Sequence, residues 1–555
     1  MNRLFAAFFI PFFFISLHPA LAQNSDKHFV YFKDKANSPY SLSKPEQFLS
    51  PAALKRRQKQ KITLNQRDLP VNPSYVTGLK ALGVEVRYKS KWLNGAVIVC
   101  DSAKLMQVLA LPFVKNGQTL NREIPGKKGD DPEQIEVLIS GSSALNARKT
   151  ADPAQYGESY LQAEMIGATQ MHDAGFHGEG MTVAVFDNGF PGVDRTIPFA
   201  HLYQNNQVKG AYNFVANNKN VYSRGGHGTN TLSNIAAYQP GKFIGTAYKA
   251  NIYLFVTEDD DGENPIEEAY WLIAAEYADS AGVDVINSSL GYSNKFDNPS
   301  LEHTYADMDG NTTIVTKAAD IAASTGMLVV NSAGNEGDKT WRYIIAPADG
   351  DSVLTVGAVD AQTNKASFSS FGPTSDNRIK PNLAAMGVQA AVVNSFGEVG
   401  KSNGTSFSGP ILAGLATGFW QANPQLTNMQ VIEYLQRSAT QANNPDNNLG
   451  YGIPNFMKAQ ELVSKDFGLV NTLTLYPNPT NTNVLHLGFA EMAYAGPVDI
   501  KIYDRTGRLV DQVLLQRELG QPMEFKLSSA VVSGLYIVQV AWAENVETLR
   551  FVKLP

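Results

Sequence analysis

The sequence predicts an α/β fold for its central region, a three-layer domain with a mainly parallel sheet, flanked by a small α+β module and a C-terminal β-sandwich. Between about residues 155 and 465, apolar stretches of four to eight residues alternate with helical stretches such as "PIEEAYWLIAAEYADSAG". Apolar strands indicate a sheet covered on both faces, and their alternation with helices indicates parallel pairing. The length of 555 residues also predicts several domains.

The flanking regions have residue patterns that differ from that of the central region. In residues 23–115, short alternating strands ("HFVYF", "VEVRY", "GAVIV") mix with two helical stretches, "SPAALKRRQKQK" and "PSYVTGLKALG", which predicts the α+β module. Residues 116–154 carry charges, Gly and Ser without periodicity, so we expect an exposed linker with a processing site. Residues 471–555 alternate between Asx-Pro and Gly turns, which indicates the separate β-sandwich.

The N-terminus, residues 1–22, has the features of a secretory signal peptide. Arg3 precedes an apolar stretch, and Ala20-Leu21-Ala22 provides a small-residue cleavage pattern. A transmembrane anchor is the alternative, but the apolar run is broken by Pro11 and is short for a bilayer span of roughly 20 residues. We therefore expect an exported protein with no stable transmembrane anchor.

Charge and cysteine content exclude several classes of protein. Lys+Arg number 46 and Asp+Glu 52, for a formal net charge of -6, so no nucleic acid or acidic membrane is expected as a partner. Cys100 is the only cysteine, which rules out an intramolecular disulfide. Its flanks, "GAVIVCD", predict a buried strand and a structural role.

The segment "NGTSFSGP", residues 403–410, places Ser406 among small residues. A tight turn that happens to contain a hydroxyl is the simple alternative. A serine hydroxyl becomes a useful nucleophile only when an imidazole takes its proton and a carboxylate orients that imidazole. A catalytic role for Ser406 therefore requires a suitable His and Asp elsewhere.

Three further polar residues stand at the ends of predicted elements. His227 lies in "RGGHGTN", where glycines allow close backbone access before a small-residue helix. Asp187 ends the apolar strand "MTVAVFD", where a carboxylate is costly to bury unless other groups hold it. Asn335, in "LVVNSAGNEG", could donate to a developing oxyanion. Taken singly, each also fits an ordinary role: a helix-terminal His, an Asx turn or an Asn-Gly turn.

Together and in this order, the motifs resemble the subtilisin-like serine proteases, the subtilase or S8 peptidase family. The matching blocks, all within about 155–465, are "VAVFDNGF", "GGHGTN", "INSSLG", "NSAGNEG" and "NGTSFSGP". The resemblance implies that Ser406 is the nucleophile, His227 the general base and then acid, and Asp187 the orienting carboxylate. Asn335 and the backbone N–H of Ser406 would bind the oxyanion.

The same resemblance assigns substrate contacts. Ser289, Leu290 and Gly291 match the edge segment that pairs with an extended substrate, and Ala333 and Gly334 would line the first pocket. A simple exit from strand to turn is the alternative for the "SSLG" motif.

Two positions depart from the family pattern. Phe407 stands where Met is frequent, and Gly409 where Ala or Thr is common. Both are packing positions behind the nucleophile, so they put the fine shape of the pocket in doubt.

The resemblance requires no cofactor, but one acidic stretch needs an interpretation. "EDDDGENPIEE", from Glu258 onward, could form a structural calcium site or a subsite for basic residues. It lacks the spacing of a twelve-residue calcium loop, so a solvated acidic loop is favoured and no metal is assigned.

The flanking modules carry resemblances of their own. The module at 23–115 resembles, in size and position, the propeptides of secreted subtilases, which template folding and then block the cleft. The tail, with "LYPNPTNTNVLHL", "VDIKIYDRTGRLV", "SGLYIVQV" and Lys553, resembles the C-terminal sorting domain of the type IX secretion system. A carbohydrate-binding or adhesive β-sandwich is the alternative. The implied route is Sec export followed by outer-membrane passage in a Gram-negative bacterium, to the medium or the cell surface.

These observations predict a secreted serine endopeptidase made as a zymogen, which hydrolyses extended polypeptides through an acyl-enzyme on Ser406. Its expected partners are polypeptide substrates, its own propeptide as inhibitor and the type IX secretion machinery. The alternative is a catalytically silent surface binding protein or adhesin. Such a protein should show a damaged constellation, whereas all four positions are intact here.

Overall fold

The structure is a computed structural model that divides into two compact units, Met1–Met457 and Lys458–Pro555, each considered by itself. The residues described are 26–121, 153–467, 473–489, 495–518, 523–543 and 545–554. The predicted signal peptide, residues 1–22, and most of the predicted linker, residues 116–154, lie outside them. Within the described residues, no helix combines the length and apolar character needed to cross a bilayer.

The first unit is built around a seven-stranded sheet in which every neighbouring pair is parallel, in the order β13-β12-β11-β10-β5-β9-β6. The inner strands β5 and β11 are almost fully buried, as their apolar sequences predict. The strands are β5 (Thr182–Asp187), β6 (Val208–Asn213), β9 (Asn251–Val256), β10 (Val285–Ser288), β11 (Leu328–Ser332), β12 (Val353–Val359) and β13 (Leu383–Met386).

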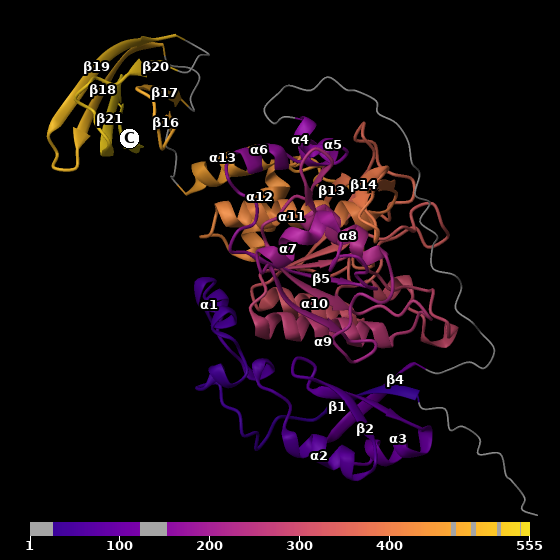
Figure 1. Ribbon diagram of the computed structural model, residues 1–555. Helices are drawn as coiled ribbons and strands as arrows, with labels where there is room; N and C mark the ends of the chain where they lie inside the picture. Colours follow the sequence, from indigo (N-terminus) through magenta and orange to yellow (C-terminus); the bar gives the residue numbers. More distant parts are fainter. Residues whose placement is uncertain are drawn as a thin grey trace, which may run out of the picture. The chain divides into compact units, whose positions relative to one another are not determined.

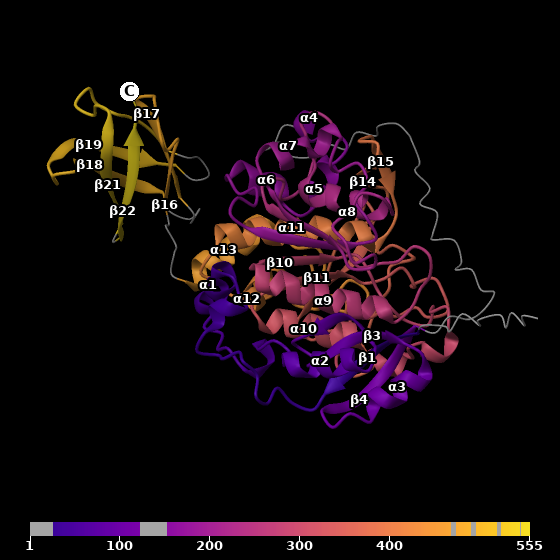
Figure 2. The same ribbon diagram turned by 60° about the horizontal axis from the view of Figure 1, so that its bottom comes forward.

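Helices cover both faces of this sheet, which confirms the predicted three-layer α/β fold. α9 (Ile266–Ala281) and α10 (Ile314–Ser324) lie on one face, while α8 (His227–Ala236) and α11 (Thr405–Ala422) lie on the other (Figures 1 and 2). The smaller elements are α4 (Pro153–Tyr156), α5 (Tyr160–Met165), α6 (Ala168–Asp173), α7 (Ala200–Gln204), α12 (Asn428–Ser438), α13 (Phe456–Asp466), β7 (Tyr238–Gln239), β8 (Phe243–Ile244), β14 (Ala390–Val393) and β15 (Val399–Ser402).

The N-terminal module is a four-stranded antiparallel sheet, ordered β2-β3-β1-β4, with three helices. Its elements are β1 (Asp26–Phe32), α1 (Pro51–Lys59), α2 (Pro73–Ala81), β2 (Glu85–Ser90), β3 (Gly95–Cys100), α3 (Ser102–Leu109) and β4 (Val114–Asn121). The strands and first two helices occupy the predicted stretches, whereas α3 was not predicted. Strand β4 also takes up the first residues of the predicted linker, so the module continues past residue 115.

Cys100 is the last residue of β3 and is buried, in keeping with its predicted structural role. Burial raises the pKa of its thiol to about 11, so the thiolate is scarce at neutral pH. The module also packs on the central domain, because Phe29, Tyr88 and Trp92 belong to the same buried cluster as residues of α9 and α10. Helix α9 is therefore covered from two sides, by the sheet and by the module.

The second unit consists of two antiparallel sheets, ordered β16-β17-β20 and β19-β18-β21-β22. Leu485 and Leu487 from the first sheet share one buried cluster with Ile500, Val538 and Phe551 from the second, as expected for a β-sandwich. The strands are β16 (Leu473–Tyr476), β17 (Val484–Phe489), β18 (Gly496–Asp504), β19 (Leu509–Arg517), β20 (Met523–Lys526), β21 (Gly534–Trp542) and β22 (Asn545–Lys553).

Candidate active site

Three of the four predicted catalytic residues, His227, Asn335 and Ser406, line one cavity of about 570 Å³. The fourth, Asp187, lies behind His227 as the last residue of β5 and is fully buried. The cavity opens beyond the carboxyl ends of the parallel strands, where open α/β sheets bind their ligands. Its other lining residues are Asn188, Gly225, Gly226, Asn230, Asp260, Asn394, Ser395, Phe396, Asn403 and Phe407.

The buried carboxylate of Asp187 is held by three donors. Its Oδ1 accepts from His227 Nδ1 at 2.7 Å and from the backbone N–H of Asn188 at 2.9 Å. Its Oδ2 accepts from Thr231 Oγ1 at 2.9 Å. An ionised carboxylate can only accept, so the proton of the neutral imidazole lies on Nδ1 and the lone pair lies on Nε2. Thr231 was not singled out from the sequence, although its position four residues after His227 places both on one face of α8.

Ser406 is the second residue of α11, after Gly404 and Thr405. The first N–H groups of a helix lack intrahelical acceptors, so the Ser406 backbone N–H is available to an anion at the positive end of the helix dipole. Pro410, four residues later, cannot donate to the Ser406 carbonyl. Ser289 Oγ fills that place and donates to the Ser406 carbonyl at 3.0 Å.

The amide of Asn335 is oriented by Thr405. Asn335 Oδ1 accepts from the Thr405 backbone N–H at 2.9 Å and from Thr405 Oγ1 at 3.0 Å. A backbone N–H can only donate, so the oxygen of Asn335 must be the atom that faces Thr405. The NH₂ end of the amide is thereby left as the donor. Thr405 was not singled out from the sequence, because its neighbour Asn335 is 70 residues away along the chain.

Tight packing brings these elements together and explains one departure from the family pattern. A Cβ on Gly228 would lie 2.2 Å from the Gly189 carbonyl oxygen, so only glycine lets α8 approach the end of β5 this closely. A Cβ on Gly409 would lie 2.7 Å from Ser332 Oγ, which favours glycine there. The other departure, Phe407, is buried against β14, with its ring centroid 6.0 Å from that of His227.

The predicted substrate-binding residues do not line this cavity, but they adjoin the nucleophile. Ser289, Leu290 and Gly291 directly follow β10, and Ser289 reaches the Ser406 carbonyl as described above. The backbone N–H of Gly334 donates to Thr405 Oγ1 at 3.2 Å, and Ala333 is fully buried. Their contact with substrate therefore stays a prediction.

The favoured interpretation of the acidic stretch was a solvated loop, but only part of the stretch is exposed to solvent. Carboxylate oxygens of Glu258, Glu263 and Glu267 all lie within 4.8 Å of one another. Burial, followed by repulsion from Asp297, raises the pKa of Glu263 to about 7. Asp261, by contrast, has a side chain that is 73% exposed.

Three family models match successive parts of the chain. The model for the Subtilase family matches residues 178–452, the Peptidase S8 propeptide domain of Bacteroidota matches 27–134, and the Secretion system C-terminal sorting domain matches 474–553. Subtilisin NAT of Bacillus subtilis subsp. natto is 32% identical over 302 residues, which is 54% of this chain and 69% of that protein. The chain belongs to the subtilase family.

Other relatives agree with this assignment. The subtilase is 32% identical over 294 residues to Subtilisin of Bacillus pumilus, covering 52% of this chain and 93% of that protein. It is 28% identical over 311 residues to Alkaline protease of Alkalihalobacillus alcalophilus, covering 56% and 72%. The two flanking models confirm the predicted propeptide and type IX sorting domain, and the sorting domain indicates release or display at the cell surface.

The propeptide of this subtilase is anchored on α9 by buried charges. Asp279 accepts from Arg56 Nη2 at 2.6 Å, from Arg57 Nη2 at 3.0 Å and from Lys91 Nζ at 2.8 Å. Burial alone would raise the pKa of Asp279, but the three cations together hold it below its usual range. Arg57 also pairs with Asp68 within the propeptide at 2.8 Å.

Further hydrogen bonds extend this anchor. Arg56 donates to the carbonyls of Val283 at 2.5 Å and Thr325 at 3.2 Å, just beyond the C-terminal ends of α9 and α10, where a cation is favoured. Glu276 of α9 accepts three hydrogen bonds from one turn of the propeptide, from Ser90 Oγ at 2.5 Å, Lys91 N at 2.8 Å and Trp92 N at 3.1 Å.

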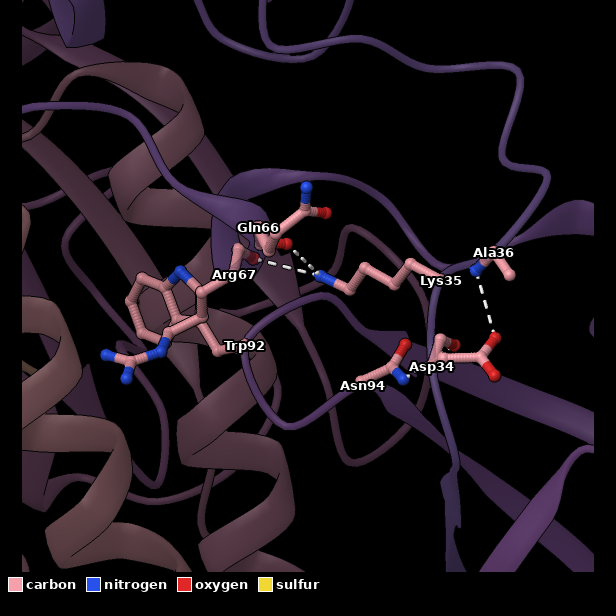
Figure 3. A pocket seen from close by; sticks show the side chains of 7 residues that line it. All are labelled: Asp34, Lys35, Ala36, Gln66, Arg67, Trp92 and Asn94. Atoms are coloured by element: carbon pink, nitrogen blue, oxygen red, sulfur yellow. Dashed lines mark hydrogen bonds between the residues drawn. The ribbon is translucent and has the colours of Figure 1, made fainter.

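A pocket inside the propeptide shows how the anchor is organised (Figure 3). Lys35 follows β1, and its amine donates to the carbonyls of Gln66 at 2.9 Å and Arg67 at 3.1 Å (Figure 3). It also donates to the carbonyl of Lys91 at 2.7 Å. Gln66 and Arg67 directly precede Asp68, which pairs with Arg57, and Lys91 is the lysine that reaches Asp279. One amine thus ties both halves of the anchor together.

Proposed function

We propose that this subtilase is a secreted serine endopeptidase, made as a zymogen, which hydrolyses peptide bonds of extended polypeptides through an acyl-enzyme on Ser406. The observation that carries the proposal is the meeting of His227, Asn335 and Ser406 in one cavity, with Asp187 hydrogen-bonded to His227 at 2.7 Å. These groups supply a nucleophile, a base, its orienting carboxylate and an oxyanion donor.

Acylation follows from these positions. Ser406 Oγ attacks the scissile carbonyl carbon while its proton passes to Nε2 of His227, the ring nitrogen opposite the one that bonds Asp187. Asp187 stabilises the resulting imidazolium. His227 then gives this proton to the departing amine, the C–N bond breaks, and an ester on Ser406 remains.

The negative charge on the former carbonyl oxygen needs donors at the moment it develops. Asn335 Nδ2 and the backbone N–H of Ser406 fill this role, because Thr405 occupies the amide oxygen of Asn335 and the helix start leaves the N–H without an acceptor. Both donors are held in place before substrate binds, so little reorganisation is needed.

Deacylation repeats these steps with water. His227 takes a proton from the water that attacks the ester, and the proton returns to Ser406 Oγ as the acid product leaves. The base must be neutral to act, so activity should rise as His227 loses its proton.

The flanking modules set where and when this chemistry operates. We infer that residues 1–22 direct Sec export and that the sorting domain directs outer-membrane passage. The propeptide, anchored on α9, holds the precursor latent until it is cleaved between the module and the peptidase domain. The charged anchor around Asp279 supports this role, because the three cations that pair with it in the described part of the chain all belong to the propeptide.

The proposal is tested by labelling the exported, processed protein with a fluorophosphonate and mapping the adduct, with Ser406→Ala as the control. We expect one adduct on Ser406 that is lost in the control. An unlabelled protein, even after removal of the propeptide, would contradict the proposal and favour the surface binding protein or adhesin.

A further inference from the structure

We propose that Asp260 makes the cleft select substrates with Lys or Arg immediately before the residue that carries the scissile carbonyl. This inference rests on the proposed function and adds a substrate class to it. Asp260 lines the same cavity as His227 and Ser406 and lies outside the proton-transfer chain.

The carboxylate of Asp260 is fixed beside the catalytic pair. Asn188 Nδ2 donates to Asp260 Oδ1 at 2.9 Å, and Asn188 Oδ1 accepts from the backbone N–H of Gly228 at 3.3 Å. Asn188 directly follows Asp187, and Gly228 directly follows His227. Asp260 is therefore linked through Asn188 to the end of strand β5 and to the start of helix α8.

Among the described residues, Asp260 forms no ion pair of its own, although the charge of Arg224 is close enough to act on it. Arg224, the basic side chain nearby, pairs with Asp259 at 3.5 Å and with Asp261. Arg224 therefore pairs with the two neighbours of Asp260 and with none of the cavity-lining carboxylates. Burial raises the pKa of Asp260, while the Asn188 hydrogen bond and the nearby charge of Arg224 oppose this rise.

The course of an extended substrate gives the position that faces Asp260. Successive side chains of an extended chain point to opposite sides. If the residue with the scissile carbonyl points toward the ends of β10 and β11, where Ala333 and Gly334 lie, the preceding residue points toward the ends of β5 and β9. Asp187 ends β5 and Asp260 follows β9, so a basic side chain at that preceding position reaches Asp260.

The test uses fluorogenic peptides that differ only at this preceding position, with Arg, Lys, Gln, Leu or Glu, on the processed enzyme. We expect kcat/KM for Arg and Lys to exceed that for Gln by about fivefold or more, since a partly screened charge pair contributes on the order of 1 kcal/mol. The ratio should shrink in 1 M salt. In Asp260→Asn it should fall close to one.

Asp261→Asn is the matched control, because it removes the same charge from the neighbouring, more exposed side chain, which does not line the cavity. It should keep most of the preference. Arg224→Gln is a second variant, which frees two carboxylates next to Asp260 and should increase the ratio.

The outcomes separate this inference from the function on which it rests. Equal turnover of the Arg and Gln peptides by the wild type, or an Arg/Gln ratio unchanged in Asp260→Asn, would overturn the role of Asp260 while leaving the peptidase intact. Absence of turnover on every peptide together with absence of a Ser406 adduct would overturn both.

Discussion

The candidate catalytic cavity and the propeptide anchor on α9 use polar groups in opposite ways. In the cavity, His227 and Ser406 line about 570 Å³ of open space, and one buried carboxylate, Asp187, accepts mainly from neutral donors. At the anchor, Asp279 is fully buried and three cations surround it. The cavity holds groups ready for substrate, whereas the anchor uses full charge pairing to hold a removable domain.

The two regions also differ in which domains supply their residues. The candidate catalytic residues Asp187, His227, Asn335 and Ser406 all lie in the part of the chain matched by the Subtilase family model, whereas the anchor joins that part to the propeptide. The anchor joins Arg56 and Lys91 to Asp279 across 223 and 188 residues. Changes in the cavity should therefore reduce turnover without freeing the propeptide, and changes in the anchor should free the propeptide without altering turnover.

The largest expected effect separates proton transfer from binding. Asp187→Asn would present an NH₂ group to His227 Nδ1 and favour the wrong tautomer, so kcat should fall by about 10⁴-fold. Steady-state kinetics on a small peptide should show KM nearly unchanged. A loss of kcat/KM that came from KM alone, with kcat unchanged, would contradict the role of Asp187.

Loss of the oxyanion donor should have the next largest effect. For Asn335→Ala we expect kcat to fall by about 100- to 1000-fold, a magnitude that comes from a subtilisin itself and not from this structure. Thr405→Val, which removes only one of the two donors to Asn335 Oδ1, is the comparison variant and should have a smaller effect. Equal losses in the two variants would argue against a direct oxyanion contact by Asn335.

Removal of a single propeptide cation should weaken the anchor. Arg56→Gln removes one of the three cations that pair with Asp279, and breaking a buried ion pair costs about 3 kcal/mol or more. When the processed complex is rapidly diluted, the propeptide should then dissociate about 100-fold faster. The return of peptidase activity measures this rate.

Lys55→Gln is the matched control, since Lys55 lies on the same helix but is exposed. The processed enzyme has the same sequence in both variants, so kcat should not change. An equal effect of the two substitutions would show that overall charge, and not the buried pair, holds the propeptide.

The smallest effect concerns a buried carboxylate that lacks the cations of Asp279. With its pKa raised to about 7, Glu263 takes up a proton in the folded state over a range where the unfolded chain, at about 4.3, does not. The free energy of unfolding therefore falls as pH rises through this window. Glu263→Gln should be more stable than wild type by about 1 to 3 kcal/mol at pH 8, and the gain should vanish near pH 4.

Chemical denaturation at both pH values measures this difference. A loss of stability in Glu263→Gln at pH 8, accompanied by a calcium-dependent stabilisation that only the wild type shows, would contradict the protonated state. It would indicate instead that Glu258, Glu263 and Glu267 hold a cation.

The catalytic fold was predictable because local rules govern it. Apolar strands that end in Asp187 or lead into Asn335, and a small-residue helix that begins beside Ser406, need no knowledge of distant contacts. Thr231 could also have been found from its helical spacing to His227. Strand β4 was missed because "VKNGQTLN" is largely exposed and lacks the apolar alternation of a half-buried strand.

The anchor could not have been predicted in the same way. Arg56 and Arg57 look like the solvated end of an amphipathic helix, and Asp279 looks like the exposed side of another. Their burial depends on how two domains dock, and nothing within either segment signals that. The link from Asn188 to Asp260 was equally hidden, because it joins loops that follow two different strands.

The most direct test of the account is the rate at which fluorophosphonate labels Ser406 in three samples: the uncleaved precursor, the uncleaved Arg56→Gln precursor and the processed enzyme. We expect slow labelling of the precursor, faster labelling of the Arg56→Gln precursor and the fastest labelling of the processed enzyme, all on Ser406. Equal rates in the three samples would contradict latency through the anchor, and no adduct on Ser406 would contradict the catalytic site itself.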